Sequence, residues 1–156
     1  MRASRVLVSI LLYCCVVSAA DAAVTASGGW SRQTVPGSVI GVGYVTLHND
    51  GSLPRKLLRV SSPVAERVEP HETTVGSDGV ARMRPLAGLV IQPGETIRFA
   101  PGGKHFMLLG LKEPLQAGAV VRLQLEFENE APITIALAVE AMPLSINPAG
   151  HDHSQH

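Results

Sequence analysis

Residues 120–129 have the sequence VVRLQLEFEN, in which apolar and polar side chains alternate. In an extended strand, successive side chains point to opposite faces of the sheet, so the apolar residues share one face. This period of two predicts a β-strand with one face in a hydrophobic core and the other in water. The apolar face consists of Val121, Leu123, Leu125 and Phe127.

Other short runs rich in β-branched residues precede and follow this strand. Turn-forming clusters such as Asn49-Asp50-Gly51 and Ser77-Asp78-Gly79 separate them, and no helix of ordinary length fits between the turns. The pattern predicts an all-β fold, an antiparallel Greek-key sandwich or barrel whose loops can gather side chains that are distant in sequence. The predicted strands are 38–49, 56–62, 96–100, 120–129 and 132–140.

Residues 1–22 have the three parts of a secretory signal peptide. Arg2 and Arg5 form a positive start, Val6–Val17 is an apolar run too short to span a bilayer comfortably, and small residues follow. Cleavage is expected after Ala20 or Ala22. The sequence therefore predicts an exported domain, which is periplasmic if the source is a Gram-negative bacterium.

The chain has two cysteines, Cys14 and Cys15, and both lie inside this signal peptide. A lipid attachment site is not expected at either one, because Tyr13 precedes Cys14 and Cys14 precedes Cys15 where a small residue is needed. The exported chain then has no thiol, which excludes disulfides and thiolate metal ligands.

Removal of the signal peptide leaves one domain at 23–142 and a flexible tail at 143–156 as the predicted organisation. Of 13 basic residues, loss of Arg2 and Arg5 leaves 11, and of 13 acidic residues, loss of Asp21 leaves 12. This balance argues against a nucleic-acid partner. No second apolar segment of spanning length follows, so we expect no membrane span after the signal peptide is cleaved. We also expect the domain to be a monomer.

The stretch KHFMLLG, residues 104–110, places His105 beside Met107 on one face if it is extended. His71 and Met83 lie on either side of a predicted turn and can approach each other across a hairpin. Imidazole with thioether indicates Cu(I), a soft ion, whereas Zn(II), Ca(II) and Mg(II) gain little from methionine. Taken singly, Met107 also fits core packing and His105 a hydrogen-bonded structural role.

The joint spacing resembles the periplasmic copper chaperone family PCu(A)C. It consists of His71-Glu72, ten residues, Met83, twenty-one residues and His105-Phe106-Met107, with Glu72 where the family often has a second methionine. The resemblance extends to SSPVAERVEPHET (61–73), RMRP (82–85) and PGGKHFMLLGLKEPL (101–115). It covers nearly the whole predicted domain.

The resemblance implies a cupredoxin-like β-sandwich that binds one Cu(I) at an exposed site. On that analogy the ligands are His71, Met83, His105 and Met107. It also implies delivery of copper to the binuclear copper site of cytochrome c oxidase subunit II, directly or with a Sco-type thiol protein. Glu72 is not expected to be a ligand; it is either a group that orients a ligand or a solvated carboxylate.

The tail adds three histidines, His151, His153 and His156. Interspersed imidazoles suit Cu(II), Zn(II) or Ni(II) better than methionine does, so an auxiliary Cu(II) site is one hypothesis. A solvated chain end without a specific role is the other.

Two other classes of function would need residues that this sequence does not have. A zinc hydrolase with H-E-x-x-H would need histidine where Val75 stands, and a blue-copper electron carrier would need a cysteine ligand. A copper storage or tolerance protein, and a structural β-sandwich without metal, stay open. We expect a Cu(I) carrier and not an enzyme.

Overall fold

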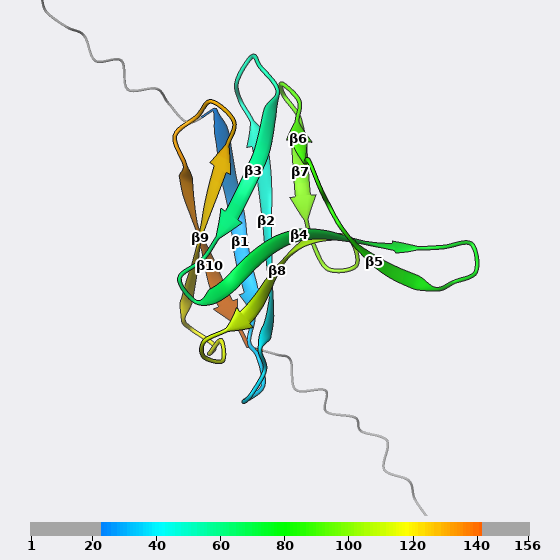
Figure 1. Cartoon of the computed structure of the whole chain (residues 1–156), viewed down its shortest axis with the longest axis vertical. Helices are drawn as coiled ribbons and strands as arrows, with labels where there is room; N and C mark the ends of the chain where they lie inside the picture. The colour runs from blue at the N-terminus through cyan, green and yellow to red at the C-terminus, as the bar shows by residue number, and fades with distance from the viewer. Residues whose placement is uncertain (1–22, 142–156) are drawn as a thin grey trace, which may run out of the picture.

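The computed structural model describes residues 23–141, and Figure 1 shows that this part of the chain is built from β-strands. The predicted signal peptide and the tail histidines lie outside the described residues. Within those residues, no helix is long and apolar enough to cross a membrane. The strands are β1 Val24–Arg32, β2 Ile40–Asn49, β3 Arg55–Ser61, β4 Ala65–Val75, β5 Ala81–Pro85, β6 Val90–Ile91, β7 Thr96–Phe99, β8 Lys104–Leu111, β9 Val120–Phe127 and β10 Ile133–Glu140.

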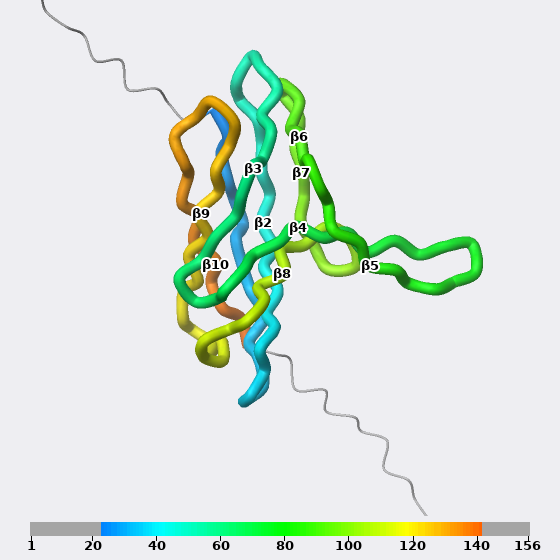
Figure 2. Tube along the Cα trace, in the orientation of Figure 1, coloured from blue at the N-terminus to red at the C-terminus, as the bar shows by residue number. Residues whose placement is uncertain are grey.

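The strands form one sheet in the order β5-β4-β8-β7-β2-β1-β10-β9-β3-β6, with further pairings β4–β3 and β8–β2. Strands β4 and β3 lie near opposite ends of this order, so their pairing closes the sheet. Figure 2 shows the elongated body that results. Most pairs are antiparallel, whereas β1–β10 and the short β7–β8 contact are parallel. The predicted all-β sandwich or barrel class is confirmed.

The core contains the apolar face that the alternation in β9 predicts, since Val121, Leu123, Leu125 and Phe127 are all buried. In β8, the fully buried residues are Phe106 and Leu108, and the Phe106 ring stacks on Phe99 at a centroid distance of 4.2 Å. Full burial of such a side chain stabilises the fold by about 1.5–3 kcal/mol. This anchoring fixes which residues of β8 point outward.

The β4–β5 hairpin projects sideways from the body (Figure 1). Its turn is closed by the Asp78 carboxylate, which accepts a hydrogen bond from the Val80 N–H at 3.0 Å and pairs with Arg82 at 2.6 Å. The base of the hairpin is tied to the body because the Thr73 N–H donates to the Gly103 carbonyl at 3.1 Å. The hairpin therefore has a fixed base and an exposed end.

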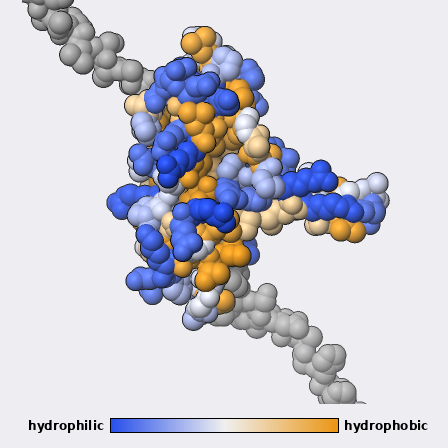
Figure 3. Space-filling view, in the orientation of Figure 1, coloured by the Kyte–Doolittle hydropathy of each residue, from blue (hydrophilic) through white to orange (hydrophobic). Residues whose placement is uncertain are grey.

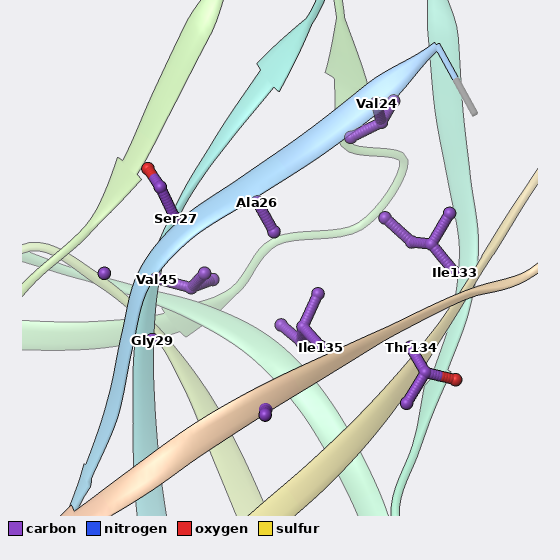
Figure 4. A pocket seen from close by; sticks show the side chains of 10 residues that line it. Val24, Ala26, Ser27, Gly29, Val45, Ile133, Thr134 and Ile135 are labelled. Carbon is purple, nitrogen blue, oxygen red and sulfur yellow. The ribbon is translucent and has the colours of Figure 1, made fainter. Parts of the chain in front are cut away.

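A pocket of about 410 Å³ lies between β1 and β10 and is drawn in Figure 4. It forms because β1 has a bulge between Ser27 and Trp30, with Gly28 at a φ of 62°, and pairs with β10 only beyond the bulge. Its lining has no histidine, methionine or charged residue. It therefore offers neither metal ligands nor acid–base groups.

Candidate metal centre

Two histidines meet across β4 and β8. His71 pairs directly with His105 in the antiparallel register, and their rings stack with centroids 6.0 Å apart and planes 23° apart. Both are nearly buried, at 8% and 5% exposed. Buried imidazoles need partners for their polar atoms, so the contacts of the ring nitrogens decide what the pair can do.

One nitrogen of each ring is held by the backbone. Nδ1 of His71 lies 3.2 Å from the Glu69 carbonyl oxygen, and Nδ1 of His105 lies 3.0 Å from that of Gly103. A carbonyl oxygen only accepts, so each Nδ1 carries the proton and donates it. In the neutral ring this leaves a lone pair on Nε2, the arrangement usual in metal-bound histidines.

Nε2 of His105 is buried and has no hydrogen-bond partner among the described residues. Leaving a buried polar atom unpaired costs about 1–3 kcal/mol. A bound metal ion would remove this cost, because the lone pair of Nε2 would then be coordinated. The donor set therefore fits a metal ion at this position.

Met107 lies on the same face of β8 as His105. The intervening Phe106 is fully buried on the core side, so positions 105 and 107 both point away from the core. Met107 is half-buried and stands opposite Val42 on β2 and Glu69 on β4. The predicted arrangement of this histidine and methionine on one face is present in the structure.

Met83 reaches the same face from β5. It pairs with Thr73 on β4. Two residues closer to the body, on the same face of the hairpin, His71 pairs with Pro85. Met83 is thus a diagonal neighbour of His71, a relation that corresponds to about 7–8 Å and is within reach of a long side chain. Its side chain is exposed at 53%. The predicted hairpin contains His71 and Met83 on its two strands.

The four residues predicted as ligands thus share one face of the three adjacent strands β5, β4 and β8. Among the described residues there is no group of three or more His, Cys, Asp and Glu side chains placed to hold a metal ion. A metal centre here would therefore depend on the two thioethers. Two neutral imidazoles and two thioethers form a donor set that favours Cu(I).

Two carboxylates lie near the histidines, one on each face of the sheet. Glu72 points to the opposite face from His71 and pairs with the Lys104 ammonium at 2.8 Å, joining β4 to β8. Glu69 shares the face of His71, and its Oε2 lies 3.9 Å from Nε2 of that ring. Sequence analysis did not identify Glu69, although its position two residues before His71 in a strand predicts the shared face.

An aromatic pair lies on the same outward side of the neighbouring strands. Trp30 on β1 faces Tyr44 on β2, with ring centroids 4.5 Å apart. Burial raises the pKa of the Tyr44 hydroxyl, and the positive charge of Arg32 opposes that shift. His48, further along β2, bonds to Thr96 at 2.8 Å and takes no part in the histidine pair.

Comparison with known proteins gives the family. A family model described as "Putative lipoprotein LpqE-like" matches residues 24–139. The chain belongs to this LpqE-like family. The relative "Putative lipoprotein Lxx21020" of Leifsonia xyli subsp. xyli (strain CTCB07) is 31% identical over 117 residues, which are 75% of this chain and 69% of the relative.

Solved structures share the fold of this LpqE-like chain. The apo PCuAC domain from PmoF1 has a TM-score of 0.64 at 25% identity, with 78% of this chain and 96% of that domain covered. CuI-DR1885 from Deinococcus radiodurans has a TM-score of 0.56 at 32% identity, with 72% of this chain and 75% of that protein covered. The expected cupredoxin-like PCuAC fold and the resemblance to the PCu(A)C family are confirmed.

Proposed function

We propose that this protein is an exported Cu(I) carrier that holds one ion through His71, Met83, His105 and Met107. The observation that carries the proposal is the stacked histidine pair, in which both Nδ1 atoms donate to backbone carbonyls and Nε2 of His105 is buried without a partner. Methionines on both sides complete a Cu(I) set. The similarity to CuI-DR1885 supports the choice of ion.

The ligand set suits a carrier without catalytic turnover. All four donors are neutral in their binding form, and thioethers lose no proton, so Cu(I) binding requires no thiolate. The half-exposed Met83 leaves the ion accessible from one side. An acceptor with cysteine ligands can therefore displace the thioethers, because thiolates are stronger ligands for Cu(I).

For the destination of the copper, we propose cytochrome c oxidase subunit II or a Sco-type thiol protein, with the carrier acting as a monomer in the periplasm. The signal-like sequence of residues 1–22 supports export. The family and the relative are both named lipoproteins, and a lipid-anchored form is the alternative to a free one. Mass spectrometry of the mature N-terminus distinguishes the two.

The test of Cu(I) binding is an anaerobic competition titration of residues 23–156 against a coloured chelator. We expect one tight equivalent, lost in His105→Leu and weakened in Met83→Leu. The controls are His48→Gln and Met142→Leu, which remove the same residue types elsewhere and should keep wild-type affinity. Absence of a tight equivalent in the wild type would favour a structural module.

The tail is tested separately by ending the chain after Pro148. Cu(I) affinity should be unchanged, because the proposed ligands all lie within the described domain. An auxiliary Cu(II) site at His151, His153 and His156 predicts that one Cu(II) equivalent disappears with the tail. Unchanged Cu(II) binding would show that the tail is not a copper site.

A further inference from the structure

An apolar surface continues from the proposed copper centre along β2 and β8. Ile40 and Val42 alternate outward on β2, and their partners on β8 are Leu109 and Met107. Ile40 is 46% exposed, although it is a large hydrophobic residue in a strand. We call the outward side chains of Ile40, Val42, Met107 and Leu109 the β2–β8 face.

The loop between β1 and β2 extends this face. Val35 and Val39 are both exposed, and the Leu111 N–H donates to the Val39 carbonyl at 3.0 Å, which holds the loop beside the end of β8. Figure 1 shows this loop at the end of the body opposite to the β2–β3 connection. The space-filling view in Figure 3 also shows apolar surface towards that end, although hydrophilic residues cover much of the visible surface. A continuous apolar surface beside a ligand residue indicates an interaction site.

Charged side chains of both signs border the β2–β8 face. Arg67 pairs with Leu109 across β4 and β8 and its side chain is 70% exposed, while Arg32 and Arg98 lie at exposed positions of β1 and β7. The carboxylates near the face are Glu69, opposite Met107 and 3.9 Å from Arg67, Glu66, which packs over Gly110, and Glu140, which stands beside Arg32. Charges of both signs thus border an apolar centre next to the Trp30–Tyr44 pair, and the 70% exposed side chain of Arg67 lies at its edge.

The position of the copper centre requires a transfer partner to cover this region. The reverse side of β8 is the core, so an acceptor's ligand atoms can reach the ion only from the outward side. A standard protein contact covers about 800 Å² on each partner, a disc of roughly 16 Å radius. Ile40 is one strand and two residues from Met107, about 8 Å, and thus lies well inside that disc.

We propose that the β2–β8 face is the docking surface for a copper-accepting protein. The partner that fits has cysteine thiols as receiving ligands, apolar side chains beside them and a carboxylate that can reach Arg67, because it must complement apolar residues with a 70% exposed arginine at their edge. This inference rests on the proposed function and names the contact through which it operates.

The test measures Cu(I) transfer by anaerobic stopped flow from the loaded protein, residues 23–156. The acceptors are the Sco-type dithiol protein and the soluble domain of cytochrome c oxidase subunit II from the same organism, and a small Cu(I) chelator serves as a docking-independent acceptor. The test variants are Ile40→Asp and Arg67→Glu. The matched controls are Leu58→Asp, at a 56% exposed leucine of β3, and Arg122→Glu, at an exposed arginine of β9.

We expect Ile40→Asp and Arg67→Glu each to slow transfer to the protein acceptor at least tenfold, with transfer to the chelator unchanged within twofold. Arg67→Glu should also flatten the decrease of the rate with ionic strength. Both controls should transfer at the wild-type rate. Circular dichroism and Cu(I) loading establish that each variant is folded and filled.

Equal transfer rates for Ile40→Asp and the wild type would overturn the docking proposal, and so would an equal effect of Leu58→Asp. Loaded wild-type protein that gives copper to the chelator but to neither protein acceptor would overturn it as well. Self-association by sedimentation that Ile40→Asp abolishes would assign the face to a second copy of this chain instead. Failure of the wild type to bind Cu(I) contradicts the proposed function itself, so the two failures are distinguishable.

Discussion

Replacing His105 by leucine separates the stability cost of the proposed metal centre from its proposed function. The ring makes one hydrogen bond, from Nδ1 to the Gly103 carbonyl, and leaves Nε2 buried without a partner. Leucine removes both polar atoms and keeps an apolar side chain of similar size. The Gly103 carbonyl stays satisfied in the variant, because it also accepts from the Thr73 N–H at 3.1 Å.

The expected change in the free energy of unfolding follows from these two terms. Loss of the Nδ1 hydrogen bond costs about 0.5–1.5 kcal/mol, and removal of the unpaired Nε2 returns about 1–3 kcal/mol. The metal-free variant should therefore be more stable than the metal-free wild type by roughly 1 kcal/mol. With free Cu(I) a thousandfold above its Kd, the wild type gains about 4.1 kcal/mol, a gain that the variant should lack.

The assay is anaerobic urea unfolding with and without buffered Cu(I), followed by circular dichroism. His48→Leu is the matched control, because both ring nitrogens of His48 have partners, Thr96 at 2.8 Å and Asp50 at 3.2 Å. That variant should lose a little stability and keep the full response to Cu(I). If metal-free His105→Leu were destabilised by about 2 kcal/mol or more, Nε2 would not carry the cost assigned to it.

Three further predictions concern the surroundings of the centre. Met83→Leu should weaken Cu(I) binding at least tenfold in the chelator titration, yet leave metal-free stability within about 0.5 kcal/mol, since the side chain is exposed. Hydrogen bonds from the Arg82 guanidinium and from a backbone N–H lower the pKa of Asp78 below its ordinary 3.8. The ionised carboxylate therefore stabilises the turn fully at neutral pH, and this stabilisation is lost as the pH falls through the lowered pKa. Amide exchange across the hairpin, measured from about pH 5 to about pH 2, should detect the loss. Glu72→Gln should alter Cu(I) affinity less than twofold, because Glu72 pairs with Lys104 on the opposite face; a tenfold loss in the same titration would contradict this placement.

Local patterns predicted the parts of this structure that depend on alternation alone. The buried face of β9 follows from its period of two, and the shared face of His105 and Met107 follows from the same rule. Both require only that the segment is extended. The all-β class likewise follows from many short alternating runs separated by turns.

Features that depend on register between strands were not predictable from residue patterns. The pairing of His71 with His105 joins residues from β4 and β8, and a shift of one residue would send one ring to the other face. The direction of Glu72, its pairing with Lys104 and the approach of Glu69 to the ring follow from the same register. Only the spacing shared with the PCu(A)C family indicated that these strands meet.

The division of the proposed centre into rigid and adaptable ligands would account for how a tight site could still release its ion. The imidazoles are buried and oriented by backbone carbonyls, so their Nε2 atoms keep their positions whether or not copper is bound. The thioether of Met83 projects from an exposed hairpin strand, and that of Met107 borders the β2–β8 face. Unbranched thioethers with three rotatable bonds can leave and return without disturbing the backbone. Ligand exchange should therefore begin at the methionines, while the histidine pair holds the ion in place until the acceptor's thiols have bound it.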